Sequence, residues 1–211
     1  MAQKGLARDT VVRAALELLD EVGLDGLTVR RLAARLGVQN PALYWHFRNK
    51  QELLDEMSRE LLGPDMGGPR DGETWRDWLA RRAHRYRRIL LSHRDGARLV
   101  AGSDPGPAVA RAFEKELKAL TGLGFTPAEG LHAISSLSHY TLGFVLNEQG
   151  RRDRQARGAG HDLAEYAAEF PLTVAGVRES GAPTSDEAFA HGLRLILDGI
   201  AATRNSSTNL S

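Results

Sequence analysis

Basic side chains able to contact phosphate are concentrated in the stretch GLDGLTVRRLAARLGVQNPALYWHFRNK, residues 23–50. From residue 26 to residue 50 this stretch has no acidic residue. Such one-sided charge suits a surface that lies on the phosphates of a nucleic acid. An ordinary helical hairpin with a solvated basic face is the alternative interpretation. The charged residues are Arg30, Arg31, Arg35, Arg48 and Lys50.

Metal and acid–base chemistry have weaker support in the sequence. No two histidines lie four residues apart with a carboxylate between them, as an HExxH zinc site requires. His132 and His139 are seven apart and share a face of a predicted helix, but no third ligand is nearby. The chain has no cysteine and no serine in a G-x-S-x-G turn. We therefore expect neither a metal site nor an enzyme.

The elements that must position the basic residues are two short helices. Apolar residues such as Leu32, Leu36, Leu43 and Phe47 follow helical spacings of three and four, without strand-like alternation. A glycine at residue 37 is suited to end the first helix, because the residue after a helix often has a positive φ. Asn-Pro at 40–41 restarts a helix, with asparagine as N-cap and proline as the first helical residue. The pattern predicts a helix-turn-helix, whose second helix can enter the DNA major groove.

The segment LTVRRLAARLGVQNPALYWHFRNKQELLD resembles the DNA-binding domain of the tetracycline repressor family of bacterial regulators. Two later segments, LLSHRDGA (90–97) and SHYTLGFVL (138–146), are similar to the ligand-binding core of tetracycline repressors. The resemblance covers about residues 11–146 and, more faintly, the last helix. It implies an all-α fold with four parts: a helix-turn-helix domain (1–50), a connecting helix (51–62), a ligand-binding and dimerisation domain (74–203) and a disordered tail (204–211).

The resemblance also implies which residues contact DNA. Arg30 matches a family arginine that reads guanine through two parallel hydrogen bonds, and Tyr44, His46 and Lys50 match positions that hold the DNA backbone. The amide of Asn40 either caps its helix or pairs with adenine, since one side chain cannot readily do both. We expect Trp45 to lie partly in the core. The complete predicted set is Arg30, Gln39, Asn40, Pro41, Ala42, Tyr44, Trp45, His46 and Lys50.

Two departures from the family pattern concern the ligand. Tetracycline repressors hold a magnesium chelate of the drug through a histidine near the sixth helix and a glutamate on the eighth. The resemblance places Val100 and Asn147 at these positions, and neither offers the imidazole or carboxylate that the metal needs. Glu148 points about 100° away from its neighbour and is a poor substitute. We therefore expect no cofactor and no magnesium. The predicted ligand-binding residues are Met66, Arg82, Tyr86, Val100, Phe113, Glu116, Ile134, His139 and Asn147.

The remaining candidates suggest a different ligand chemistry. Arg82 together with Tyr86, Phe113 and His139 would suit an aromatic molecule that carries an anionic or enolate oxygen. An internal salt bridge between Arg82 and Glu116 is the alternative use of that arginine. The sequence does not decide between the two.

These observations predict a homodimeric, cytoplasmic repressor that binds a palindromic DNA operator and is released by a small-molecule inducer. Antibiotic response is the expected setting. Two alternatives stay open: a true tetracycline-responsive repressor of an exporter gene, and a DNA-binding protein that needs no ligand.

The distribution of charge agrees with a DNA-binding function for the N-terminal part and another function for the remainder. The net charge of the chain is +1, yet residues 1–50 carry eight basic and five acidic residues, and the remainder carries two more acidic than basic residues. No apolar run approaches the roughly 20 residues that span a bilayer, and no apolar signal segment opens the chain. We therefore expect no membrane partner.

Turn and capping residues predict the other helix boundaries. We expect a first helix from a cap at Asp9 or Thr10 to about Glu21, a loop over 63–73 and a helix capped by Thr74. Thr126 to Glu129 is a capping box that opens a helix to about residue 149. Beyond it we expect a charged loop over 150–162, a minor helix over 162–170 ended by a proline, and a last helix capped near Ser185 that carries Leu193 and Ile196 in a dimer interface.

Overall fold

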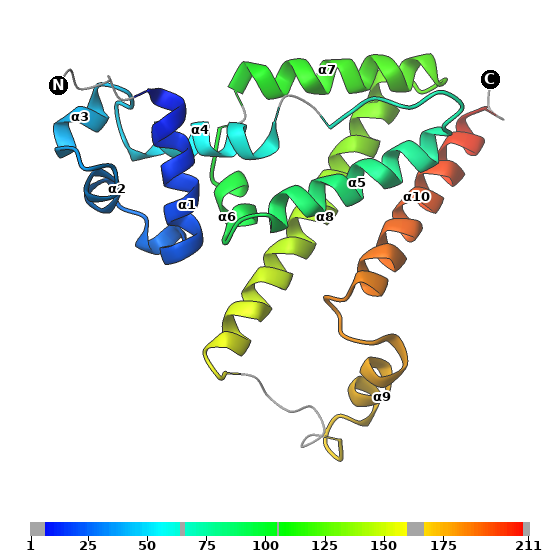
Figure 1. The fold of residues 1–211 in the computed structure, drawn as a ribbon. Helices are drawn as coiled ribbons and strands as arrows, with labels where there is room; N and C mark the ends of the chain where they lie inside the picture. Colours follow the sequence, from blue (N-terminus) through cyan, green and yellow to red (C-terminus); the bar gives the residue numbers. More distant parts are fainter. Residues whose placement is uncertain (1–6, 64–65, 105, 160–166, 209–211) are drawn as a thin grey trace. The chain divides into compact units, whose positions relative to one another are not determined.

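A computed structural model describes residues 7–63, 66–104, 106–159 and 167–208, and within these ranges every regular element is a helix (Figure 1). The chain divides into two compact units. The first contains Met1–Gly68 and Arg85–Glu116, and the second contains Pro69–His84 and Leu117–Ser211. The first unit therefore holds more than the predicted DNA-binding domain and connecting helix. No helix among the described residues is long and apolar enough to cross a membrane.

The expected all-α fold is confirmed, and its elements follow the chain in a simple order. The helices are α1 (Arg8–Gly26), α2 (Val29–Leu36), α3 (Asn40–Tyr44), α4 (Lys50–Leu62), α5 (Trp75–Leu91), α6 (Gly96–Ala101), α7 (Gly106–Gly122), α8 (Pro127–Ala156), α9 (Pro171–Ser180) and α10 (Asp186–Thr208).

The first helix is longer than the sequence predicts. α1 begins at Arg8 behind an N-cap alanine that makes no side-chain cap, so the expected cap at Asp9 or Thr10 is wrong. The helix bends at Gly23, whose φ of +71° is strained for any residue with a side chain, and it ends at Gly26. Helical hydrogen bonding resumes after this bend, and it continues past the predicted end at Glu21.

Apolar side chains from α1 to α4 form the core of the first unit. Val11, Leu19, Leu32 and Met57 are buried in it, and Leu99 of α6 belongs to the same cluster. The predicted cap of α4 is confirmed, because Asn49 Oδ1 accepts a hydrogen bond from the backbone N–H of Glu52 at 2.8 Å. The α6 segment is thus packed into the unit that carries the predicted DNA-binding helices.

In the second unit, α8 and α10 lie against each other. The capping box of α8 is confirmed, because Thr126 and Glu129 exchange side-chain and backbone hydrogen bonds. Tyr140 of α8 donates to the backbone carbonyl of Phe189 at 2.9 Å and stacks on its ring. A Cβ at Gly192 would overlap the Tyr140 hydroxyl, so the close approach of the two helices requires glycine there.

Three helix boundaries in the second unit correct the sequence-based expectations. α8 continues to Ala156 where a loop was expected, and Arg152 pairs with Glu148 one turn earlier at 2.6 Å. Pro171 begins α9 instead of ending a helix, and residues 160–166 of the expected minor helix lie outside the described residues. α10 extends to Thr208, beyond residue 203 where a tail was expected. The cap at Ser185 is confirmed, because its Oγ accepts from the Ala188 N–H at 3.1 Å.

The ion pair between Glu73, which precedes α5, and Arg81 in α5 makes the stability of the second unit depend on pH. Glu73 accepts from Arg81 Nε at 2.7 Å and from its Nη2 at 2.6 Å. These bonds, together with the Arg70 N–H, lower the pKa of Glu73 from 4.5 to about 2. A lowered folded-state pKa contributes stability above the unfolded pKa, and this contribution is lost as the pH falls toward 2.

We therefore predict that Glu73→Gln flattens the fall in thermal midpoint between pH 4.5 and about 2. Thermal unfolding followed by circular dichroism at several pH values measures this. Asp71→Asn, an exposed neighbour, is the control and should keep the wild-type profile. Identical profiles for wild type and Glu73→Gln would contradict the prediction.

Candidate nucleic-acid interface and ligand-binding residues

The turn between α2 and α3 has the geometry that the sequence predicts. Thr28 caps α2 by accepting from the Arg31 N–H at 3.2 Å. Gly37 ends α2 with a φ of +67°, and the N–H of Val38 returns to the Ala33 carbonyl at 3.0 Å. α2 is therefore fixed by a capping bond at its start and by a backbone bond at the turn.

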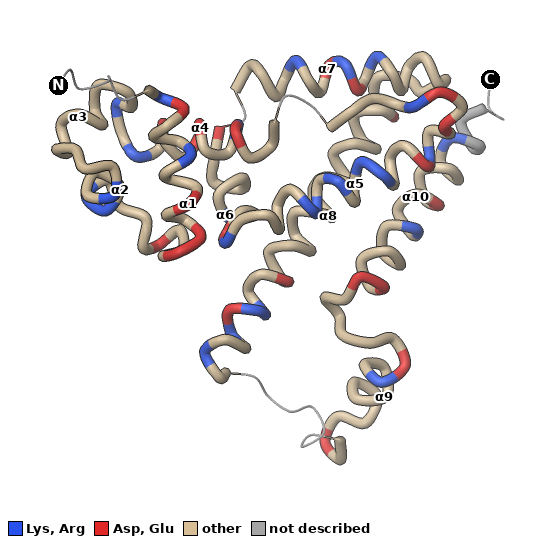
Figure 2. The backbone as a smooth tube through the Cα atoms, in the orientation of Figure 1, with Lys and Arg blue, Asp and Glu red and all other residues tan. Residues whose placement is uncertain are grey.

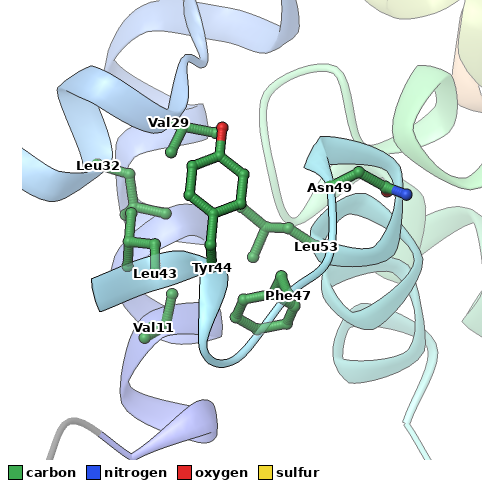
Figure 3. Close-up of a pocket in the computed structure, with 8 residues that line it drawn as sticks. All are labelled: Val11, Val29, Leu32, Leu43, Tyr44, Phe47, Asn49 and Leu53. Carbon is green, nitrogen blue, oxygen red and sulfur yellow. The ribbon is translucent and has the colours of Figure 1, made fainter. Parts of the chain in front are cut away.

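Leu43 and Phe47 anchor α3 and the segment after it to the core. Figure 3 shows both side chains directed toward Val11, Leu32 and Leu53. A cavity of about 10 Å³ lies among these apolar side chains, which leaves room for at most one water molecule. The apolar contact between α3 and its neighbours is therefore closely packed, and a function of α3 depends on its exposed side.

The opposite side of α3 is exposed. Tyr44 is 54% exposed and Trp45 is 89% exposed, so the expectation that Trp45 lies partly in the core is wrong. Its helix turns it to solvent, because Leu43 and Phe47 already occupy the buried side. Of the nine residues predicted to contact DNA, Ala42 and His46 are half-buried and the other seven are exposed. We call these nine residues the reading face.

The N-cap of α3 is Gln39, which makes no side-chain cap bond, and Asn40 is the first helical residue. The expectation that Asn40 caps the helix is therefore wrong. Its amide has no hydrogen-bond partner among the described residues, so it can pair with a base. Adenine offers the donor and acceptor that an asparagine amide matches.

Figure 2 marks the lysine and arginine positions in blue, including those of α2. By the contacts of their side chains, the basic residues of the motif divide into two groups. Arg35 pairs with Glu17 at 2.9 Å and with Glu21 at 2.7 Å, and these bonds raise the pKa of Arg35. Arg31 donates to the Gly26 carbonyl at 2.9 Å. The side chains of Arg30 and Lys50, in contrast, make no ion pair or hydrogen bond within the described ranges. These two cations are available for DNA, whereas Arg35 holds α2 to α1.

The predicted ligand-binding residues are distributed over both units. In the second unit, Arg82 and Ile134 are buried, and Arg82 Nη1 donates to Ser138 Oγ at 3.1 Å. His139 and Asn147 lie on α8 and are exposed, and the Asn147 amide donates to the Gly143 carbonyl at 2.9 Å. Glu148 is buried and pairs with Arg152. In the first unit, Tyr86 and Glu116 are buried, and the others are half-buried: Met66, Val100 and Phe113.

A set of polar contacts between α1 and the start of α6 was not predicted. Asp95 accepts from the Leu24 N–H at 2.8 Å, and Asp20 accepts from the Arg94 N–H at 2.8 Å. Asp95 has a φ of +56°, and no other non-glycine residue in the described ranges has a positive φ. The Asp-Gly pair at 95–96 was a signal for such a turn. These contacts place α6 against the end of α1 within the first unit.

No three histidine, aspartate or glutamate side chains among the described residues are grouped as a metal site. At the two positions where the family resemblance implies magnesium ligands, Val100 has no donor atom and the Asn147 amide is neutral. Magnesium prefers oxygen ligands, usually carboxylates, so these residues do not fit that ion.

A short helix held at the end of a glycine turn, with exposed arginine, lysine and asparagine side chains, defines a helix-turn-helix DNA-binding protein. Comparison with known proteins agrees. The family described as bacterial regulatory proteins, tetR family, matches residues 11–57, and the tetracyclin repressor-like C-terminal domain matches residues 68–204. The chain therefore belongs to the tetracycline repressor family of bacterial transcriptional regulators, which are not enzymes.

Individual relatives cover nearly the whole chain. The class A tetracycline repressor protein from transposon 1721 of Escherichia coli is 43% identical over 202 residues, which are 94% of this chain and 92% of that protein. A possible TetR family regulator from Streptomyces coelicolor A3(2) is 36% identical, with a TM-score of 0.79 over 93% of this chain and 100% of that one. TetR class A in complex with 5a,6-anhydrotetracycline and magnesium is 37% identical, with a TM-score of 0.72 over 93% and 99%.

Proposed function

We propose that this protein is a homodimeric repressor that binds a palindromic DNA operator and leaves it when a small molecule binds the second domain. The observation that carries this proposal is the exposure of the reading face, in which Arg30 and Lys50 make no ion pair with any residue that the structure describes. A repressor of this kind would act in the cytoplasm, where the bacterial chromosome is accessible.

Exposed apolar residues on α8 and α10 support the dimer. Leu131 is 43% exposed and Leu195 is 59% exposed in a single chain. Covering them with the same helices of a second copy would bury them and would set two reading faces on two half-sites. Leu193, expected in the interface, is 2% exposed and is part of the protomer's own core. We therefore assign the interface to the side of α10 that carries Leu195.

The proposed inducer is aromatic and does not arrive as a magnesium chelate. Support comes from the donor set, since Val100 and Asn147 replace the expected metal ligands. In the second unit, buried Arg82 supplies a cation. An arginine fork binds an anionic or enolate oxygen through two hydrogen bonds.

Release would pass through α6 and α4, which contact each other in the first unit. Gln51 donates to the Gly102 carbonyl at 2.9 Å, and Asp55 accepts from the Asp104 N–H at 3.0 Å. A ligand that displaces the 93–107 segment would break these bonds. The base of α4, next to the reading face, would then move.

Two alternatives remain in competition with this proposal. A tetracycline-responsive repressor of an exporter gene is favoured by the names of several relatives, such as the class A and class C tetracycline repressor proteins. A DNA-binding protein without an inducer would have the same reading face. Selection of binding sites from a random DNA library tests sequence-specific DNA binding, which the proposal and both alternatives share. Failure to enrich any palindromic sequence would contradict the proposed repressor.

We predict different effects for two substitutions on the reading face. Arg30→Ala should cost about 1–3 kcal/mol on the selected operator and little on random DNA, because a base contact carries sequence information. Lys50→Ala should weaken binding to both DNAs alike and lower the salt slope by about one, because a phosphate contact carries no sequence information. Gel-shift titrations at several salt concentrations measure both. Equal losses on the two DNAs for Arg30→Ala would show that it contacts only phosphate.

A further inference from the structure

The side chain of Arg8, the first residue of α1, is directed toward the protein. Its Nη1 donates to the backbone carbonyl of His46 at 3.0 Å. Its Nη2 donates to Glu52 at 3.1 Å and to Glu56 at 2.6 Å, both on α4. One guanidinium thus joins α1, the segment that follows α3, and α4.

From these contacts we infer that Arg8 is a positioning residue for DNA recognition, which fixes the reading face by tying the segment after α3 to α1 and α4. The inference rests on the proposed DNA-binding function and names a residue outside the helix-turn-helix itself. Its contacts make it part of the support behind the reading face.

The aromatic ring below the guanidinium strengthens this connection. The guanidinium carbon of Arg8 lies 4.7 Å from the centre of the Phe47 ring, and Phe47 is buried in the core. A cation over an aromatic face is attracted by the ring as well as by the carboxylates. The arginine is therefore held from two directions, by the ring and by the acidic side chains.

Further hydrogen bonds of Glu52 connect the contacts of Arg8 with residues 48 and 49. Glu52 uses its other oxygen to accept from the Arg48 N–H at 2.8 Å, while its own N–H is bound by Asn49. The bonds to Arg48 and Arg8 lower the pKa of Glu52, so it is a carboxylate at neutral pH. Hydrogen bonds thus connect Arg8 to His46 and Glu52, and Glu52 to residues 48 and 49.

The recognition helix needs such external support because it is short. α3 has five residues, fewer than an isolated helix needs for stability in water. Its orientation must come from tertiary contacts at its two ends. The turn at Gly37 fixes the beginning, and the contacts of Arg8, Phe47 and Glu52 fix the segment after its end. Trp45 and His46 belong to that segment, and Lys50 follows it as the first residue of α4.

Arginine is required at this position by the number and directions of the bonds. The planar guanidinium donates to a carbonyl on one side and to two carboxylates on the other. A lysine ammonium supplies the same charge from one nitrogen and cannot span both groups. Arg8→Lys should therefore keep the attraction to Glu52 and Glu56 and lose the bond to His46.

The first test compares DNA binding of Arg8→Gln, Arg8→Lys and the control Arg13→Gln. Arg13 lies exposed on the same helix, so its substitution changes the net charge equally. We expect Arg8→Gln to lose about tenfold or more in affinity for the selected operator and much less for random DNA, because misplaced base contacts affect only the specific complex. Its salt slope should be unchanged, Arg8→Lys should be intermediate, and Arg13→Gln should match wild type on both DNAs.

A phosphate contact predicts a different result. Equal losses on both DNAs, with a salt slope smaller by about one, would overturn the inference. Arg8→Lys with wild-type affinity would also overturn it, since the bridging geometry would then be unnecessary. Thermal unfolding of each variant separates local effects from failure to fold. If Arg8→Gln does not fold, Glu52→Ala removes the other half of the same set of contacts and is expected to lose operator affinity selectively.

A second measurement does not depend on DNA. Amide hydrogen exchange at residues 46–52 should be faster in Arg8→Gln than in wild type and Arg13→Gln, because the Arg48 N–H loses a fixed acceptor. Unchanged exchange would overturn the positioning role even if DNA affinity fell. Faster exchange in a protein that enriches no DNA sequence would support the role of Arg8 and would contradict the proposed repressor.

Discussion

Replacing Leu195 with glutamate is expected to convert the protein from a dimer into a folded monomer. Leu195 is 59% exposed in one chain, so a charge there leaves the protomer intact. In a dimer that covers α10, each copy would bury an unpaired carboxylate at a cost of about 3–5 kcal/mol.

Loss of the dimer should remove most of the operator affinity. A repressor that binds two half-sites gains from having both reading faces on one particle, whereas a monomer binds one half-site alone. Sedimentation velocity at micromolar concentration measures the first effect, and gel shift on the selected operator measures the second. We expect both to change together.

Two controls make this prediction specific. Arg194→Gln changes the charge by the same amount on an adjacent, exposed position and should remain dimeric. Leu193→Glu, at a residue buried within the protomer, should lower the thermal midpoint of unfolding instead of producing a stable, folded monomer. A dimeric Leu195→Glu with wild-type affinity, or a monomeric wild type, would contradict the proposed interface.

The helix-turn-helix was predictable because its signals are local. Thr28 caps α2, Gly37 has the positive φ, and the proline at residue 41 lies in the first turn of α3, each within a few residues of the element it controls. Apolar spacing then identified Leu43 and Phe47 as the buried side. Trp45 was misplaced because an aromatic residue suggests burial, although the two buried neighbours already decide which way its helix faces.

The contacts that join distant segments were not predictable. Arg8 is 38 residues from His46 and 44 from Glu52, and nothing in its neighbours indicates which carboxylate it meets. α8 was expected to end near its Gly150, yet the pairing of Arg152 with Glu148 offsets part of the cost of a glycine in a helix. In both cases charged side chains suggested a solvated surface, and the structure uses them as connections.

Tetracycline is expected to be a poor inducer of this protein, and its effect is expected not to depend on magnesium. The class A relative in complex with 5a,6-anhydrotetracycline and magnesium is 37% identical, so a shared fold alone would suggest the same ligand. The two residues at the implied metal positions argue against it. Losing two interactions of about 1.4 kcal/mol each lowers affinity roughly a hundredfold.

Restoring the ligands provides the complementary test. Val100→His with Asn147→Glu should create tetracycline-induced release of operator that requires magnesium, whereas Val100→Leu with Asn147→Gln should not. The reason is that imidazole and carboxylate groups bind a hard divalent cation, and the isosteric apolar and amide groups do not. The gain should approach a hundredfold in the tetracycline concentration needed for release if both ligands act together.

Operator release by tetracycline, measured with magnesium and with a chelator, decides between the two proposed inducers. Weak release by the wild type that is insensitive to the chelator is the expected result, and strong release that the chelator abolishes would show that the protein is a tetracycline-responsive repressor. In that case another group must supply the metal ligand. Glu148, a buried carboxylate, would have to leave the exposed Arg152 to do so, and His93 would have to leave Asp20, which it contacts at 2.8 Å. Glu148→Gln and His93→Gln would then identify which of the two holds the ion, because only the true ligand's loss would abolish magnesium dependence while leaving operator binding intact.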